Sequence, residues 1–220
     1  MSPWHSVGRQ LRRPSGFFGR LTGVLMRVVN ATPNRLAVAA LEIEPQDTVL
    51  ELGCGPGHAV AMLAAQASAG FVYGIDQSAV MLEQAQKRNR DALDAGRVFL
   101  YEAAFERLPF EDASVDKILA VNVIYFWHDI PAVLREIRRV LRPGGRIVVY
   151  ATDASAMRWW KFASPETHRL FTAAELASVF ERSGGAHSHV SVMNVPVARG
   201  VNGLIATIST PVRRSRGTFE

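Results

Sequence analysis

The sequence predicts an α/β protein with a doubly wound, mostly parallel sheet that closes with an antiparallel hairpin. Strand-like apolar runs alternate with amphipathic stretches from about residue 48 to residue 150. This alternation is typical of right-handed crossovers, which build a parallel sheet covered on both faces. Two further strand-like runs, 187–197 and 203–209, are separated by only about five residues. A helical crossover does not fit in that gap, so these two strands should pair antiparallel.

The individual elements follow from apolar periodicity and from helix-ending signals. Ser78 can cap a helix, and Thr172 and Glu175 form a capping box. Gly70 and the turn at 142–145 are expected to end the helices before them. The predicted strands lie at 48–52, 71–75, 97–101, 117–122 and 146–150, and the predicted helices at 58–68, 79–93, 131–141 and 172–182.

Composition indicates one globular domain. The chain has 220 residues, 48% of them apolar, which is enough to bury a sizeable core. No apolar run approaches the roughly 20 residues that span a membrane, and Arg20 and Arg27 interrupt the only stretch that resembles a secretory signal. The single cysteine, Cys54, fits a reducing compartment. We therefore expect a cytoplasmic protein, with a peripheral membrane location as the alternative.

Positive charge gathers at the two ends of the chain. Residues 1–41 contain six arginines and no acidic residue, and residues 211–220 contain three arginines and one glutamate, whereas the whole chain carries +5. The middle of the chain is therefore mildly acidic. We expect a basic arm at 1–41, a folded domain at 42–210 and a basic, flexible tail at 211–220. Basic ends of this kind suit an anionic surface, either lipid or nucleic acid.

An amphipathic helix is predicted within the arm, at 16–30. Apolar residues at positions 17, 18, 21, 24, 25, 28 and 29 form one helical stripe, and Arg20 and Arg27 lie off it. Such a helix either covers the ligand site as a lid or lies in a membrane surface. An arginine-rich start without acidic residues is also typical of a mitochondrial targeting segment.

A glycine-rich turn follows the first predicted strand, in the stretch 49–58 that reads VLELGCGPGH. Ligands of open α/β sheets bind at the carboxyl ends of the strands, so this turn marks the expected site. A phosphate-binding P-loop is excluded because no Gly-Lys-Ser or Gly-Lys-Thr follows. The dinucleotide fingerprint G-x-G-x-x-G is absent too, since the glycines here are spaced G-x-G-x-G.

Four segments in order resemble class I S-adenosylmethionine-dependent methyltransferases. The pattern E-x-G-x-G-x-G at 51–57 is followed by YGIDQS at 73–78, LPFEDASVD at 108–116 and VLRPGGR at 140–146. The resemblance covers about residues 45–150. Within this family, the chain is similar to the branch that contains enzymes of ubiquinone and menaquinone biosynthesis and phospholipid N-methyltransferases. The resemblance implies a Rossmann-like, seven-stranded sheet, S-adenosylmethionine as cofactor with S-adenosylhomocysteine as product, and no metal.

The resemblance also implies which residues bind this methyl donor. Asp76, at the end of the second strand, would accept both ribose hydroxyls, and Glu51 would pair with the ammonium group, directly or through water. Relatives often carry an aspartate where this chain has Ala104. Either Glu102 or a backbone group would then contact the adenine, or Phe105 would stack on it. Core packing explains Met81 as well as an adenine contact does. The implied set is Glu51, Gly53, Cys54, Gly55, Gly57, Asp76, Gln77, Met81, Ala104, Phe105 and Asn122.

The acceptor is expected near the end of the fourth strand, because the resemblance places it there. His128 and Tyr125 are the candidate catalytic residues, since an imidazole has a pKa suited to removing a proton. A merely surface-exposed His128 is an equally good interpretation. Trp159 and Trp160 either line an apolar acceptor pocket or cover the end of the sheet. The further residues expected around the acceptor are Asn122, Trp127 and His168.

The resemblance and the composition together favour a small-molecule acceptor that is apolar or lipid-like, such as a lipid or a quinone. The arm at 16–30 would then allow peripheral membrane contact. An RNA acceptor bound through the basic ends is the alternative. The mildly acidic middle of the chain argues against nucleic acid as a partner.

Overall fold

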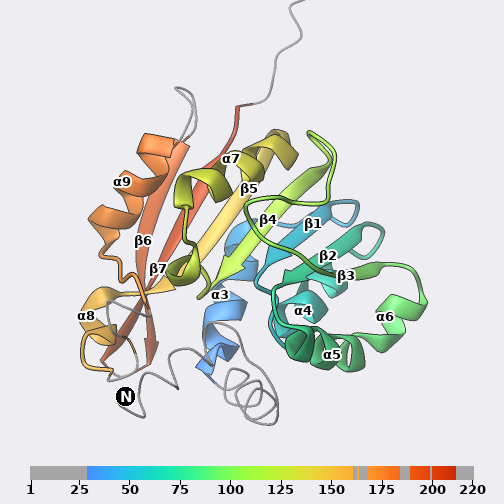
Figure 1. Cartoon of the computed structure of the whole chain (residues 1–220), viewed down its shortest axis with the longest axis horizontal. Helices are drawn as coiled ribbons and strands as arrows, with labels where there is room; N and C mark the ends of the chain where they lie inside the picture. The colour runs from blue at the N-terminus through green and yellow to red at the C-terminus, as the bar shows by residue number, and fades with distance from the viewer. Residues whose placement is uncertain (1–28, 161–162, 164–167, 184–188, 199, 212–220) are drawn as a thin grey trace, which may run out of the picture.

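The structure is a computed structural model that describes residues 29–160, 163, 168–183, 189–198 and 200–211 (Figure 1). Three expectations concern residues outside this set: most of the amphipathic helix at 16–30, the arm before residue 29, and the tail from residue 212. In the part of the chain that the structure describes, no helix combines the length and the apolar character needed to span a bilayer.

A seven-stranded sheet forms the centre of the molecule, with the strand order β3-β2-β1-β4-β5-β7-β6 (Figure 1). Strands β1 to β5 pair in parallel, and β7 pairs antiparallel with both β5 and β6. The predicted parallel sheet with a closing antiparallel hairpin is therefore confirmed. The strands are β1 (Thr48–Leu52), β2 (Phe71–Asp76), β3 (Val98–Glu102), β4 (Val115–Val121), β5 (Leu141–Thr152), β6 (His189–Ala198) and β7 (Val201–Ser209).

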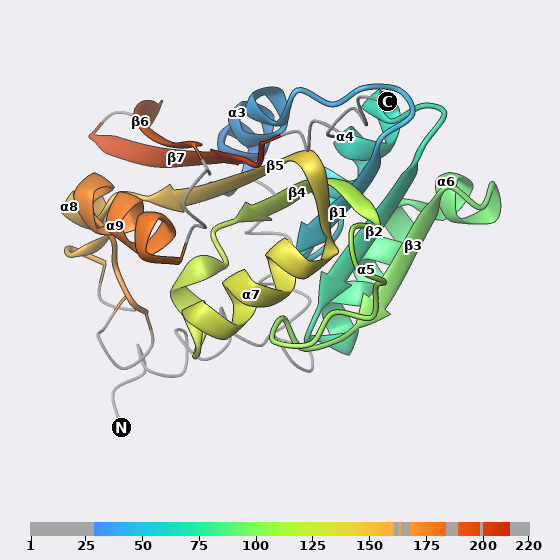
Figure 2. The same cartoon turned by 90° about the horizontal axis from the view of Figure 1, so that it is seen from above.

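Helices cover both faces of this sheet, as the alternation of elements requires. Seen from above, α3 (Ala31–Leu41) and α4 (His58–Gln66) lie on one face, and α7 (Ile130–Val140) and α9 (Ala173–Ser183) lie on the other (Figure 2). The other helical elements are α5 (Ala79–Arg88), α6 (Arg90–Asp94), the short 3-10 helix η1 (Ile124–Phe126) and α8 (Ala154–Met157).

The central strand β4 shows how the two faces are filled. Ile118 and Ala120 belong to the core cluster that includes residues of α7 and α9. Leu119 and Val121 belong to the cluster that includes residues of α3 and α4. Alternate side chains of one strand are therefore buried on opposite faces, which is why a central parallel strand is apolar throughout.

Helix α3 was not predicted, because its residues fall within the expected arm. Its apolar face is fully packed: Ala37, Val38 and Leu41 are at most 1% exposed and join the core cluster of α4. The start of the helix lies near the carboxyl ends of the strands (Figure 1). Residues 31–41 are thus part of the folded body and deliver their first turn to the expected ligand site.

Two local predictions are wrong. The helix predicted at 79–93 is interrupted at Asn89, whose buried side-chain amide donates to the carbonyl oxygens of Ala85 at 2.9 Å and Gly57 at 3.0 Å. Gly70 does not end α4, which stops at Gln66. A Cβ at Gly70 would lie 2.1 Å from the carbonyl oxygen of Asp47, so glycine is required there by close approach of the two backbones.

Candidate functional site

A cavity of about 400 Å³ lies at the carboxyl ends of β1, β2, β4 and β5. This volume falls within the range of roughly 300–1,000 Å³ that is usual for cofactor and small-molecule sites. The cavity is where the strand order reverses between β1 and β4, as expected for a doubly wound sheet. The predicted site residues that line it are Glu51, Gly53, Cys54, Gly55, Asp76, Gln77, Met81, Phe105, Asn122 and Tyr125.

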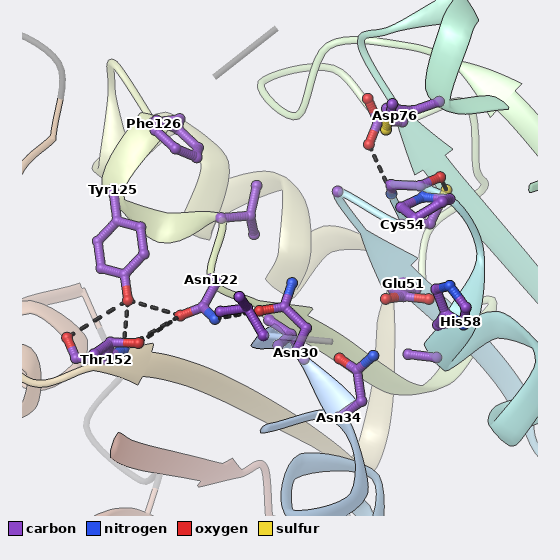
Figure 3. Close-up of a pocket in the computed structure, with 18 of the residues that line it drawn as sticks. Asn30, Asn34, Glu51, Cys54, His58, Asp76, Asn122, Tyr125, Phe126 and Thr152 are labelled. Atoms are coloured by element: carbon purple, nitrogen blue, oxygen red, sulfur yellow. Dashed lines mark hydrogen bonds between the residues drawn. The ribbon is translucent and has the colours of Figure 1, made fainter. Parts of the chain in front are cut away.

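The cavity has two sides, which Figure 3 shows with a pair of asparagines between them. We call the side after β1 and β2 the turn side, with Glu51, Cys54, Gly55, His58 and Asp76. We call the opposite side, after β4 and β5, the aromatic side, with Tyr125, Phe126, Thr152, Met157, Trp160 and His168. The asparagines between the two sides are Asn30 and Asn122.

The glycine turn on the turn side is fastened to the end of β2. The backbone N–H groups of Gly53 and Cys54 donate to the carbonyl oxygen of Ile75, at 2.8 and 2.9 Å. Gly55 has a φ of +51°, and a Cβ at this position would meet no atom within 4 Å. The turn therefore offers an open stretch of backbone to a ligand, with no side chain in the way.

Asp76 is held rigidly by the backbone around it. One carboxylate oxygen accepts from the N–H of Gly55 at 2.8 Å, and the other accepts from the N–H of Ser78 at 2.9 Å. Burial raises the pKa of Asp76, and these backbone hydrogen bonds oppose the rise. The backbone N–H of Gln77 adds a further hydrogen bond to this carboxylate. The carboxylate lies on the cavity wall at the end of β2, and its pairing with two ribose hydroxyls stays a prediction.

One carboxyl oxygen of Glu51 is unsatisfied inside the cavity. The residue is 3% exposed, and its Oε2 has no hydrogen-bond partner among the described residues, although the backbone N–H of Val60 donates to the carboxyl group. Burial, and then the negative charge of Asp76, raise the pKa of Glu51 well above its usual value. An unpartnered buried carboxyl oxygen is costly, and a cationic ligand group would offset that cost. This oxygen fits the ammonium group of S-adenosylmethionine, and the open backbone at Gly55 fits its methionine part.

The side chains expected around the adenine divide into two groups. Gln77, Met81 and Phe105 line the cavity, and the Phe105 and Met81 side chains are otherwise buried. Ala104, in contrast, is exposed and is not among the lining residues. The structure therefore brings Phe105 to the cavity in place of Ala104.

Gly57 lies outside the cavity and has a packing role. Its φ is +75°, and a Cβ there would come within 2.5 Å of the Asn89 side-chain amide and 2.8 Å of the Ala85 side chain. Glycine at this position lets the start of α4 approach α5 closely. It positions the glycine turn without itself facing the cavity.

A hydrogen-bond network joins the aromatic side to the start of α3. The Asn122 side chain donates to the Asn30 side-chain oxygen at 2.9 Å, and its own oxygen accepts from the Tyr125 hydroxyl at 2.8 Å. The same oxygen accepts from the hydroxyl and backbone N–H of Thr152 at 3.2 and 3.3 Å (Figure 3). Asn122 itself has a φ of +53°. A non-glycine residue in the left-handed region indicates that its surroundings hold it there.

The Tyr125 hydroxyl is part of this network. It also accepts a short hydrogen bond from the backbone N–H of Thr152. Burial raises the pKa of Tyr125 above its usual value, so the phenol stays protonated at neutral pH. The structure therefore gives this hydroxyl a part in holding β4 and β5 together at the cavity, and a direct catalytic role for it stays a prediction.

The histidine predicted to be catalytic is not the one on the aromatic side of the cavity. His128 is exposed and does not line the cavity, whereas His168 is 4% exposed and does. The His168 ring lies 4.9 Å from the Phe126 ring and 5.9 Å from the Tyr125 ring. Burial lowers the pKa of His168 to about 4, so the imidazole is neutral near pH 7.

Only one of the two adjacent tryptophans, Trp159 and Trp160, lines the cavity. Trp160 lines the cavity, whereas Trp159 is 80% exposed. Trp127 is buried in the core beneath α7 and does not line the cavity. The pocket interpretation thus applies to Trp160, and Trp127 belongs to the packing of the sheet face.

Sequence reasoning missed the part of the wall that α3 supplies. Val29, Asn30 and Asn34 line the cavity, and Asn34 is a polar residue on the buried face of α3, with 7% exposure. An asparagine in phase with the apolar residues of an amphipathic helix was the available signal. Val29 and Asn30 are also the last residues of the amphipathic segment expected at 16–30, so that segment ends at the cavity.

Comparison with known proteins gives a consistent family. Residues 50–149 match the family described as methyltransferase domain. The uncharacterized methyltransferase YdaC of Bacillus subtilis is 27% identical over 175 residues, which are 80% of this chain and 91% of that protein. A 2-phytyl-1,4-naphtoquinone methyltransferase of Trichormus variabilis is 36% identical over 115 residues, which are 52% of this chain and 50% of that protein.

A solved structure supports the fold over nearly the whole chain. The putative methyltransferase in a complex with the Haloferax volcanii Trm112 methyltransferase activator has a TM-score of 0.73 at 22% identity, covering 90% of this chain and 96% of that one. At this identity the likeness concerns the fold. The matched residues span only about a third to about half of the length of several curated relatives.

Proposed function

This chain carries a class I S-adenosylmethionine-dependent methyltransferase domain, and on that premise we propose that it methylates a small, uncharged and largely apolar acceptor such as a quinol. The distribution of charge around the cavity carries this proposal. Glu51 and Asp76 are the carboxylates of the described wall, and both lie on the turn side. The aromatic side offers rings, a thioether and neutral polar groups.

The turn side would hold the donor. Asp76, fixed by Gly55 and Ser78, would accept the ribose hydroxyls, and Glu51 would pair with the ammonium group. Phe105, Gln77 and Met81 would surround the adenine. When bound, S-adenosylmethionine supplies an electrophilic methyl group on an activated sulfonium. The chain's own contribution is then to orient the acceptor and to keep water away.

The described wall has no permanently cationic side chain to bind an anionic acceptor. Neither lysine nor arginine occurs among the lining residues that the structure describes, and a phosphate or carboxylate placed there would lose its hydration without gaining a cation. The same observation disfavours an RNA acceptor, because RNA binding depends on neutralising phosphates. The quinone-like acceptor of the Trichormus relative has the apolar, uncharged character that this wall favours.

The helix expected at 16–30 would cover the cavity as a lid. Its last two residues, Val29 and Asn30, line the wall, and Asn30 is hydrogen-bonded to Asn122. A lid places these residues against the ligand, whereas a helix in a membrane surface would not require it. We therefore favour the lid over peripheral membrane contact.

The direct test uses donor that carries a tritiated methyl group. Purified protein would be incubated with this donor and, in separate reactions, with 1,4-naphthoquinol, geranyl diphosphate or bulk transfer RNA. We expect label in the organic phase with the quinol, and none above background with the phosphate-bearing compounds. The Asp76→Asn protein, which should bind the donor poorly, is the matched control. Label that follows the RNA or the diphosphate would refute the proposed acceptor class.

A further inference from the structure

His168 lies on the aromatic side of the cavity, and the backbone next to it is held in place. The N–H of the next residue, Arg169, donates to the carbonyl oxygen of Tyr125 at 3.3 Å. Two residues further, the carbonyl oxygen of Phe171 accepts from the N–H of Ala154 at 2.9 Å. The segment is thus tied to η1 on one side and to the start of α8 on the other.

The His168 ring is also held by its neighbours. It meets the Phe126 ring at 4.9 Å with an interplanar angle of 65°, and the Tyr125 ring at 5.9 Å with an angle of 45°. Tyr125 and Phe126 meet each other edge to face at 5.9 Å. Three rings therefore form one corner of the cavity, and one of them carries hydrogen-bonding nitrogens.

We propose that His168 is the specificity-determining residue of the acceptor: its neutral imidazole accepts a hydrogen bond from a hydroxyl on an aromatic acceptor and orients that ring in the cavity. The inference rests on the proposed function, because it assigns an occupant to the aromatic side. It narrows the acceptor class from uncharged and apolar to a phenol, hydroquinone or enol. It also gives His168 a binding role that differs from that of a general base.

The surroundings of His168 argue for binding over proton removal. Among the described residues, the rings of Phe126 and Tyr125 pack against it, and burial lowers its pKa to about 4. The two carboxylates of the described wall, Glu51 and Asp76, lie on the opposite side of the cavity. A neutral imidazole in such an apolar corner has one acceptor nitrogen and one donor nitrogen.

The test compares two probes, of which the second carries a methyl group in place of the hydroxyl hydrogen of the first. Binding of 1-naphthol and of 1-methoxynaphthalene would be measured by calorimetry on protein saturated with S-adenosylhomocysteine. We expect the wild-type protein to bind 1-naphthol about five- to tenfold more tightly, the size of one net hydrogen bond. His168→Phe keeps the ring packing and should abolish this preference, whereas His168→Gln keeps a hydrogen-bond acceptor and should retain part of it.

Unchanged melting temperature and S-adenosylhomocysteine affinity in His168→Phe would show that only the acceptor end is altered. An equal preference in wild type and His168→Phe would overturn the proposal, as would a wild-type protein that does not distinguish the probes or binds neither. The comparison of the two probes on the wild-type protein does not depend on any variant being folded.

Steady-state kinetics separate binding from proton removal. With 1,4-naphthoquinol as methyl acceptor, His168→Gln should raise KM and leave kcat nearly unchanged, because only the binding of the acceptor is weakened. A kcat that falls about 100-fold or more in His168→Gln at unchanged KM would assign a general base instead. If the naphthol preference is present but no methyl group is transferred to any acceptor, the proposed function fails while the binding role of His168 stands.

Discussion

The side-chain amide of Asn122 donates a 2.9 Å hydrogen bond to the side-chain oxygen of Asn30, although 92 positions separate the two residues. This bond connects the start of α3 to the end of β4. It lies between the turn side and the aromatic side of the cavity (Figure 3). One asparagine, whose own backbone is in the left-handed region, therefore links the aromatic side of the cavity to the start of α3.

Two substitutions of Asn122 distinguish the stability contributed by its side-chain hydrogen bonds from the cost of its backbone strain. Asn122→Ala removes the bonds to Asn30, Tyr125 and Thr152 and keeps a Cβ at a φ of +53°. We expect it to lower the free energy of unfolding by about 2–4 kcal/mol. Asn122→Gly removes the same bonds but relieves the strain, and should be roughly 1 kcal/mol less destabilising. Urea unfolding measures both.

Ala113 provides the matched control for the strain component. Its φ is +50°, so Ala113→Gly relieves a comparable strain at a position far from the cavity wall. We expect this variant to be as stable as the wild type or up to about 1 kcal/mol more stable. If Asn122→Ala and Asn122→Gly are equally stable while Ala113→Gly gains stability, a Cβ at position 122 causes no backbone strain.

Gly55 and Gly96 are a second matched pair. Both have a positive φ, and a Cβ at either position would meet no atom within 4 Å. Gly55→Ala and Gly96→Ala should therefore lose similar stability, on the order of 1–2 kcal/mol. Gly55 alone lines the cavity, so only Gly55→Ala should weaken S-adenosylhomocysteine binding in calorimetry. Equal affinities in the two variants would contradict the assignment of this turn to the donor.

Asp76→Asn tests the ribose contact. The substitution keeps the size of the side chain and removes the charge that strengthens its hydrogen bonds, so S-adenosylhomocysteine binding should weaken by about 1–3 kcal/mol. Asp94→Asn is the control, because Asp94 lies on α6 with its side chain 73% exposed. A calorimetric affinity that is the same in both variants and the wild type would remove Asp76 from the site.

Glu51 predicts a pH dependence of stability in the ligand-free protein. Since burial raises its pKa above the usual 4.5, the folded chain retains a proton that the unfolded chain releases. The stability that this proton contributes is complete below pH 4.5 and is lost as the pH rises through the folded-state pKa. Relative to Glu51→Gln, the wild type should therefore melt at progressively lower temperature from pH 5 to pH 8.

The same substitution should act in the opposite direction on ligand binding. Glu51→Gln removes the charge that pairs with an ammonium group, so S-adenosylhomocysteine affinity should fall about tenfold or more. Glu83→Gln, at an exposed position on α5 paired with Lys87, should change neither the melting curve nor the affinity. A Glu51→Gln protein that melts in parallel with the wild type at every pH would disprove the burial argument.

The turn side could be predicted from the sequence because its chemistry is local. Glycine spacing, the acidic residue before the turn and Asp76 at the end of β2 all lie within 26 residues of one another along the chain, from Glu51 to Asp76. Backbone geometry fixes what such a turn can do, whatever packs around it. Gly57 and Ala104 are the exceptions, since the first faces α5 and the second faces away from the cavity.

The aromatic side could be predicted only in part, because its parts come together through tertiary packing. Four residues expected around the acceptor do line the cavity: Asn122, Tyr125, Trp160 and His168. His128, two residues after η1, is exposed instead, whereas His168 packs against Tyr125 and Phe126. The break at Asn89 has a similar origin. Its amide bonds to Gly57, 32 residues earlier, and no local propensity reports such a contact.

The span of the cavity wall along the chain, from Val29 to His168, has a consequence for synthesis on the ribosome. The corner of three rings cannot close until His168 has left the ribosome, after every residue of the turn side has been made. At roughly 5–20 residues per second, synthesis from the end of β2 to His168 takes about 5–20 seconds, so this corner is the last part of the wall to form.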